Sequence, residues 1–259
     1  MSVQIHPLAS VAPEAHIGTN VTIGPFAVIE SDVEIGDGTT ISAHATILHG
    51  SRIGSECAVF PGAVIGAVPQ DLKFQGEKTL AIIGDRTVIR ECATVNRGTE
   101  ATGRAIIGTD CLIMAYCHVA HDCTVGSHVI MSNVSQLAGH VSIGDWVILG
   151  GLAKVIQFCT VGDHAMIGAD CKVTKDVAPY ALIGREPAKV EGVNKIGLRR
   201  RGFSNEEIDA IQELYSSVFF SGMNTSDGLE EYERRYPIVL PEVGSCIEFI
   251  RSSRKGIIR

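Results

Sequence analysis

The sequence predicts a mainly β protein, a solenoid of short parallel strands followed by a small α-helical domain. Three observations support this prediction. Steps of six from Ile5 to Val173 give 29 positions, of which 26 are Val, Ile, Leu or Met. Two residues before each step, 27 of the 29 positions are Ala, Val, Thr, Ser or Cys. After Val173 this rhythm stops and a helical spacing replaces it.

Each group of six residues is predicted to form a short strand and a turn. Positions i−2 and i share one face of a strand, so a small and an aliphatic side chain point inward together. Gly follows the aliphatic residue in 12 cases, which suits a turn. One hexad cannot bury its own face, so the coils stack into a single domain over residues 1–189. The repeat fixes neither the number of sides nor the hand, although the general preference for right-handed crossovers favours a right-handed coil.

Two segments interrupt the repeat. Residues 67–80 place Asp71 and Glu77 where aliphatic residues belong, and residues 96–104 are polar and rich in Gly. Both are predicted to be loops extruded from the solenoid. Ordered loops on a rigid scaffold often carry binding residues.

Residues 190–259 are predicted to form the helical domain. Ser204 and Glu207 have the spacing of a capping box, and apolar residues follow from Ile208 at helical spacing, with Gly222 at the expected end. Further helices are expected near residues 229–236 and 243–252.

Charge and composition limit the function classes. The net charge of −7 argues against nonspecific nucleic-acid binding, although residues 185–259 hold 12 of the 22 Lys and Arg residues. The sequence has no basic leader and no apolar run of about 18 residues, so we expect a cytoplasmic protein without a membrane span. Six of the eight cysteines share position i−2 and no CxxC pair occurs, which predicts buried, reduced scaffold residues.

Five stretches resemble a known family. They are PQDLKF at 69–74, HVAHDCTVG at 118–126, LAGHVSIGD at 137–145, QFCTVG at 157–162 and GVNKIGLRRRGFS at 192–204. In this order they resemble the hexapeptide-repeat acyltransferases, and within them the UDP-N-acetylglucosamine O-acyltransferases of lipid A biosynthesis. The resemblance implies a left-handed parallel β-helix of triangular section, with one hexad on each side of a coil. It also implies a homotrimer whose active sites lie between neighbouring subunits.

The resemblance assigns functional roles to residues that, taken alone, would be interpreted as ordinary polar surface residues. His121 alone would be a solvated turn histidine, but His118 and His140 fall on adjacent columns of the coil. The family's catalytic histidine matches His121, which would act as general base, with Asp122 supporting the imidazolium and the Gly139 N–H holding an oxyanion. The resemblance implies these substrate-binding residues: Asp71, Lys73, His118, His140, Gln157, Asn194, Arg200 and Arg201. Ala169 stands where the family has a glycine associated with acyl-chain length.

The implied reaction moves a 3-hydroxyacyl chain from acyl carrier protein to the 3-hydroxyl of UDP-N-acetylglucosamine, the first step of lipid A biosynthesis, without metal or cofactor. Ile156 and Ile196 depart from the family pattern. One alternative acceptor is a sugar nucleotide with a 3-amino group. Another class is a γ-type carbonic anhydrase, in which His118, His121 and His140 would bind a metal. A noncatalytic trimeric scaffold would leave the loops and histidines unexplained.

Overall fold

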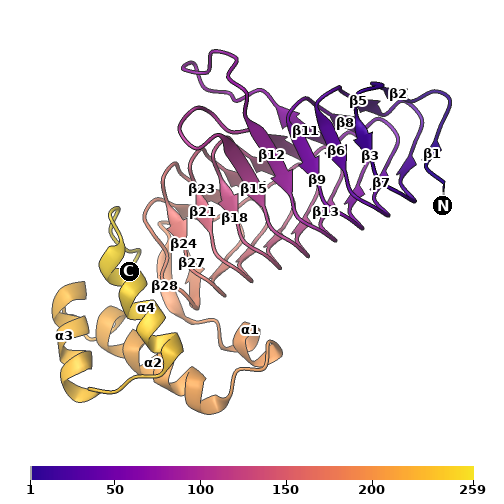
Figure 1. Ribbon diagram of the computed structural model, residues 1–259. Coiled ribbons are helices and arrows are strands. Elements are labelled where there is room, and N and C mark those ends of the chain that lie inside the picture. Colours follow the sequence, from indigo (N-terminus) through magenta and orange to yellow (C-terminus); the bar gives the residue numbers. More distant parts are fainter. Residues whose placement is uncertain (1) are drawn as a thin grey trace.

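The computed structural model, which describes residues 2–259, is a long prism of stacked coils with four helices at its C-terminal end (Figure 1). The strands form three sheets, one on each side of the prism, and every pair is parallel except the last pair of the first sheet. The first sheet contains β1 (Gln4–Ile5), β4 (Thr22–Ile23), β7 (Thr40–Ile41), β10 (Ala58–Val59), β13 (Val88–Ile89), β16 (Leu112–Ile113), β19 (Ile130–Met131), β22 (Ile148–Leu149), β25 (Met166–Ile167), β27 (Ala181–Gly184) and β28 (Lys189–Val193). The second contains β2 (Ser10–Val11), β5 (Val28–Ile29), β8 (Thr46–Ile47), β11 (Val64–Ala67), β14 (Thr94–Asn96), β17 (His118–Val119), β20 (Gln136–Leu137), β23 (Lys154–Val155) and β26 (Lys172–Val173). The third contains β3 (His16–Ile17), β6 (Val33–Ile35), β9 (Ser51–Ile53), β12 (Leu80–Ile83), β15 (Arg104–Ile107), β18 (Thr124–Val125), β21 (Ser142–Ile143) and β24 (Thr160–Val161).

The six-residue repeat determines the register in which the strands of these sheets pair. Ile5 pairs with Ile23 and Val119 with Leu137, so a regular coil consists of three hexads, each contributing one strand. Most of the repeated aliphatic side chains are buried in the prism, together with six cysteines at position i−2. The predicted scaffold role of those cysteines is therefore confirmed.

The coil is left-handed, as the resemblance implied. The right-handed coil favoured by the general crossover preference is wrong for this chain. That preference derives from the twist of longer strands, and strands of two to five residues accumulate little twist. The coil turns at tight corners, where Asp122, His140 and Phe158 adopt φ values of +59°, +60° and +65°.

Both interruptions are loops that leave the same corner, between the second and third sheets. Val59 pairs with Ile89, and Ile89 pairs in turn with Ile113. The first of these coils is therefore two hexads longer than a regular coil and the second is one hexad longer. Insertion of whole hexads keeps the phase of the repeat on both sides of each loop. The loops span residues 68–79 and 97–103, slightly shorter than predicted at either end.

The C-terminal part continues directly from the last coil. β28 spans the boundary predicted at residue 189 and pairs antiparallel with β27, and the first helix begins only at Lys195. The helices are α1 (Lys195–Arg200), α2 (Asn205–Phe219), α3 (Thr225–Arg235) and α4 (Pro241–Ser252).

The structure confirms the predicted helix start at Ser204 but not every other boundary. Ser204 Oγ accepts from Glu207 N–H, and the Glu207 carboxylate accepts from Ser204 N–H. α2 ends at Phe219, before Gly222, and α1 was not predicted from the sequence. Within residues 2–259, no helix is both long and apolar enough to cross a membrane.

Candidate active site

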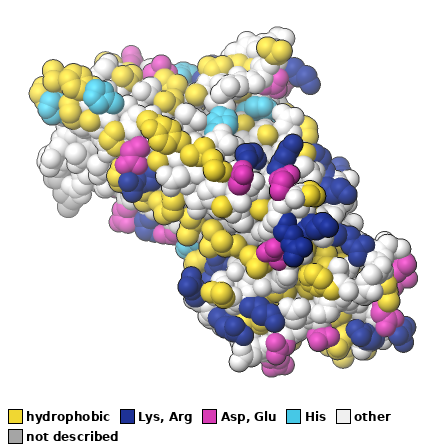
Figure 2. All heavy atoms as spheres, turned by 180° about the vertical axis from the view of Figure 1, so that it is seen from behind, with side chains coloured by type: hydrophobic (Ala, Val, Ile, Leu, Met, Phe, Trp, Pro, Cys, Tyr) yellow, Lys and Arg dark blue, Asp and Glu magenta, His cyan; other side chains and the backbone are white. Residues whose placement is uncertain are grey.

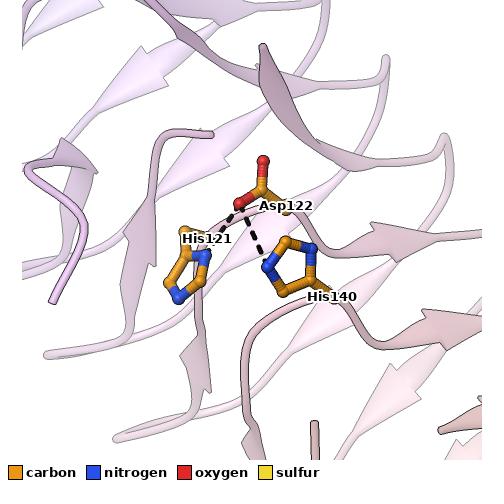
Figure 3. Close-up of side chains that lie close together, drawn as sticks. All are labelled: His121, Asp122 and His140. Atoms are coloured by element: carbon orange, nitrogen blue, oxygen red, sulfur yellow. Dashed lines mark hydrogen bonds and ion pairs between the residues drawn. The ribbon is translucent and has the colours of Figure 1, made fainter. Parts of the chain in front are cut away.

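A histidine and a carboxylate form a hydrogen-bonded pair at the corner between the second and third sheets, which we call the histidine corner (Figure 3). His121 and Asp122 follow β17 directly, and His140 occupies the next coil of the same corner. His121 Nδ1 lies 2.7 Å from Asp122 Oδ2, and the Asp122 side chain is fully buried. His140 Nε2 lies 3.7 Å from the same carboxylate oxygen.

Asp122 is ionised because loop 97–103 surrounds it with donors. Thr99 N–H donates to Oδ1 at 2.9 Å, the Thr99 hydroxyl donates to Oδ2 at 2.7 Å, and the Thr102 hydroxyl donates to Oδ1. Burial alone would raise the pKa of Asp122, but the hydrogen bonds from Thr102, His121 and Thr99 lower it to about 2. An ionised carboxylate can only accept, so it selects the tautomer of His121 that carries its proton on Nδ1. The lone pair on Nε2 is then available to take a proton.

Gly139 leaves room for this imidazole ring. The side chain of His121 packs over the backbone of the next coil, where a Cβ on Gly139 would lie 2.5 Å from Cε1 and 2.6 Å from Nε2. Among residues 2–259, the Gly139 N–H has no hydrogen-bond acceptor. A free N–H beside the basic nitrogen is the arrangement that an oxyanion site requires.

His140 is held by aromatic contacts as well as by Asp122. Its ring stacks on Phe158 of the following coil, with centroids 4.7 Å apart, and meets the His121 ring edge-on at 5.1 Å. Lys255, from the C-terminal tail, donates to the carbonyl of Gln157 at 2.7 Å and lies near Phe158. Side chains from three successive coils and the tail therefore build this corner.

Two cavities adjoin the histidine corner. One, of about 630 Å³, follows the outer face of the second sheet and is lined in part by His118, Gln157 and Lys255. The other, of about 380 Å³, lies between the two loops and is lined in part by Asp71, Lys73 and His140. The structure thus brings the predicted base together with five of the residues predicted to bind substrate.

His118 projects from β17 onto the second sheet, three residues before the base. Its Nδ1 lies 2.7 Å from the Thr94 hydroxyl of the preceding coil. Burial and then the charge of His121 lower the pKa of His118, which favours a neutral ring at neutral pH. It is therefore suited to hydrogen bonding with substrate rather than to carrying charge.

The residues predicted to bind the nucleotide lie at a different corner, between the third and first sheets. Arg201 packs over Trp146 at 5.4 Å and lies 3.4 Å from His164 Nδ1. Burial, followed by the charge of Arg201, lowers the pKa of His164 to about 4. Asn194 caps α1 by accepting from Gly197 N–H and donates to the His164 carbonyl. Within one chain, these residues do not meet the histidine corner.

Comparisons with known proteins agree with this architecture. A family model described as UDP N-acetylglucosamine O-acyltransferase, domain 2, matches residues 176–258, and a bacterial transferase hexapeptide model matches residues 2–31 and 104–134. An acyl-[acyl-carrier-protein]–UDP-N-acetylglucosamine O-acyltransferase from Chlorobium phaeobacteroides is 53% identical over 97% of this chain and 96% of its own. One from Janthinobacterium is 43% identical over 98% of this chain and 99% of its own. The chain belongs to this O-acyltransferase family.

Solved structures of family members superpose on the whole chain. A UDP-N-acetylglucosamine acyltransferase from Bacteroides fragilis has a TM-score of 0.97 at 50% identity, covering 99% of this chain and all of its own. The Arabidopsis enzyme still reaches 0.87 at 32% identity, covering 98% of this chain and all of its own. The fold therefore persists across a wide divergence of sequence within the family.

The remaining predicted positions are distributed over the prism. Ala169 is exposed at the corner between the first and second sheets, and Arg200 is exposed in the last turn of α1. Of the two departures from the family pattern, Ile156 is half-buried beside Gln157 and Ile196 is 66% exposed on α1.

The positions of the possible ligands do not favour the alternative metal site made of His118, His121 and His140. Among residues 2–259, one group of three possible ligands lies within 4.8 Å, and it consists of His121, Asp122 and His140 rather than the three histidines. His118 instead faces Thr94. Both oxygens of Asp122 already accept hydrogen bonds from the chain, so ligation would have to break them.

Sequence reasoning missed Thr99, Thr102, Phe158 and Lys255. The two threonines lie in a loop that was recognised, and one signal could have found them. The loop leaves the same corner as His121, one coil earlier, so residues of this loop are expected near Asp122, although the repeat does not determine which ones. Nothing in the local sequence of Lys255 indicates that the tail returns to the solenoid.

Proposed function

We propose that this protein transfers a 3-hydroxyacyl chain from the thioester of acyl carrier protein to the 3-hydroxyl of UDP-N-acetylglucosamine, the first step of lipid A biosynthesis. The observation that carries this proposal is the buried His121–Asp122 pair, with Nε2 of the histidine against Gly139. Membership of the family supports the choice of donor and acceptor.

The proposed mechanism uses the histidine corner directly. Nε2 of His121 takes the proton from the sugar hydroxyl as that oxygen attacks the thioester carbonyl. The Gly139 N–H stabilises the negative oxygen of the tetrahedral intermediate, and Asp122 stabilises the imidazolium. Collapse of the intermediate breaks the C–S bond, and the imidazolium returns its proton to the departing thiolate. These steps account for every bond and proton of the transfer without a cofactor.

We assign the surrounding residues to substrate binding. Asp71, Lys73 and His140 would hold the sugar in the cavity between the loops, and His118 and Gln157 would line the groove along the second sheet. Asn194 and Arg201 would bind the nucleotide, since a guanidinium group suits a diphosphate, and Arg200 would help to receive the acidic carrier protein. Ala169 would limit the acyl chain, because one methyl in a narrow groove changes which length fits.

We further propose a homotrimer, because the two halves of the site lie at different corners of one chain. In a cyclic trimer, the histidine corner of one subunit can meet Arg201 of the next. Mixing tests this arrangement. His121→Ala and Arg201→Ala subunits, each nearly inactive alone, should recover about a quarter of wild-type activity when co-assembled at random, because mixed trimers contain one intact site of three. Recovery no greater than the sum of the two variants would place both halves in the same chain.

The donor and the compartment follow from the same proposal. Lys and Arg side chains gather where the solenoid meets the helical part (Figure 2), and residues 185–259 hold 12 of the 22 basic groups. Such a surface suits an acidic carrier protein. We assign the protein to the cytoplasm and expect no nucleic acid partner.

Product analysis tests the reaction and separates it from its alternatives. Incubation of the purified protein with UDP-N-acetylglucosamine and 3-hydroxyacyl carrier proteins of graded length should yield a monoacylated nucleotide whose acyl group mild base removes, as expected for an ester. A base-stable product formed only from the 3-amino sugar nucleotide would indicate the alternative acceptor. Turnover should survive exhaustive treatment with chelator. Loss of activity that zinc restores would instead favour the metalloenzyme.

A further inference from the structure

We propose that Thr99, in loop 97–103, is a positioning residue that holds the Asp122 carboxylate in the orientation His121 needs, with Thr102 as a second donor. This inference rests on the proposed acyl transfer for its kinetic consequences. The contacts on which it is based all lie within one chain.

The loop is fixed where it covers Asp122. It occupies the histidine corner of the coil that precedes His121, and Thr99 is only 7% exposed. Its start is fixed by hydrogen bonds from Arg97 N–H to the Ala67 carbonyl and from Gly98 N–H to the Leu80 carbonyl, both at 3.0 Å. Its end is fixed by a bond from Gly103 N–H to the Thr99 carbonyl at 2.8 Å. The position of Thr99 is thus set by the solenoid.

The direction of the Thr99 hydrogen bonds is also determined. The Thr99 hydroxyl accepts from Ala101 N–H at 3.2 Å, which leaves its own proton for Asp122 Oδ2 at 2.7 Å. Oδ1 accepts from Thr99 N–H and from the Thr102 hydroxyl, which also has the Arg104 carbonyl as an acceptor at 2.8 Å. Together with Nδ1–H of His121, four donors occupy the roughly four acceptor positions of a carboxylate. Each acceptor position of the carboxylate thus faces a donor, and only the Thr102 proton is shared with another acceptor.

This saturation matters because a second histidine competes for the same oxygen. His140 Nε2 lies 3.7 Å from Asp122 Oδ2, against 2.7 Å for His121 Nδ1. Without the Thr99 hydroxyl, a small rotation would let Asp122 pair with His140. His121 would then lose the partner that keeps its proton on Nδ1. Thr99 therefore prevents the exchange of one histidine for the other.

The test replaces the hydroxyl without changing the shape of the side chain. Thr99→Val should lower kcat about 10-fold, the usual effect of losing a hydrogen bond to a charged group, and leave both KM values within about two-fold. Thr99→Ser should restore kcat, and Thr102→Val should lower it in the same direction. Thr39→Val is the matched control. Its hydroxyl is also buried and also has two hydrogen-bond partners, here the Gly54 carbonyl and Cys57 N–H, but it lies far from the site, so kcat should not change.

A double-mutant cycle decides whether Thr99 acts through Asp122. In an Asp122→Asn background, Thr99→Val should change kcat by less than about two-fold. The proposal would be overturned if the kcat losses of Thr99→Val and Asp122→Asn multiply in the double variant. An unchanged kcat in Thr99→Val, or a Thr99→Ser enzyme that does not recover kcat, would overturn it as well. A rise in KM alone would also overturn it, because it would place Thr99 in substrate binding.

A spectroscopic measurement keeps this test separate from the proposed function. In protein labelled with [15N]histidine, the Nδ1 proton of His121, assigned with His121→Ala, should be visible in wild type and Thr99→Ser and should exchange faster in Thr99→Val. If the wild type fails to acylate the sugar nucleotide, the proposed function fails while this result still stands. An unchanged Nδ1 signal in Thr99→Val would refute the positioning role whatever the reaction.

Discussion

Replacement of His121 with alanine is expected to lower kcat about 1,000-fold while leaving the fold intact, because a general base contributes roughly 10²–10⁴-fold to such reactions. The side chain is almost fully buried, yet it lies at a corner of the prism and not in the aliphatic core. Its removal is therefore expected to lower the reaction rate without disturbing the packing of the aliphatic core.

Steady-state kinetics with purified variants measures this effect. His16→Ala is the matched control, since His16 is exposed on β3 in the first coil, and its kcat should equal that of wild type. Thermal melting should give similar midpoints for the two variants. A His121→Ala enzyme that keeps more than about a tenth of wild-type kcat would contradict the assignment of the base.

Replacement of Gly139 with alanine is expected to lower kcat about 100-fold, because the new methyl group would occupy the space of the His121 ring. The ring cannot simply move away, since Asp122 holds Nδ1 at 2.7 Å and Cβ would lie 2.5 Å from Cε1. The Gly139 N–H would remain, so the variant separates displacement of the base from loss of the oxyanion donor.

The control for this variant is Gly244→Ala in α4, where the nearest side-chain atom to a new Cβ, on Val239, is 3.9 Å away. That substitution should leave kcat unchanged and favour the helix slightly. Binding of UDP-N-acetylglucosamine, followed by calorimetry, should persist in Gly139→Ala. Normal turnover in Gly139→Ala would show that the His121 ring is free to move and that the close packing has no catalytic role.

The solenoid could be predicted because its information is local and repeated. A small residue and an aliphatic residue recur in every hexad, so strands, turns and the inward face follow from the sequence, and even Ser204 and Glu207 determine the start of α2. The hand of the coil could not be predicted this way, since the same inward face fits either hand. α1 was missed because six residues, two of them arginines, carry too little periodicity.

The site could be predicted only in part, for a related reason. His121, Gly139 and Gln157 align in one column as soon as the coil length is known, whereas Thr99 reaches Asp122 through a loop whose path the repeat does not determine. Asn194 illustrates a second limit. Its sequence position indicates the nucleotide, but in the folded chain its side chain also caps α1 and bonds the His164 carbonyl.

The burial of the cysteines determines how the molecule withstands oxidation. Only Cys92 of the eight thiols is exposed. Burial raises the pKa of the others, that of Cys123 to about 12 and that of Cys159 to about 11, so they stay protonated and react poorly with oxidants. Of its cysteines the chain therefore offers one thiol for oxidation or for a mixed disulfide, and Cys92 lies at the first-to-second corner rather than at the histidine corner. Oxidation of cysteine would thus begin away from the proposed base.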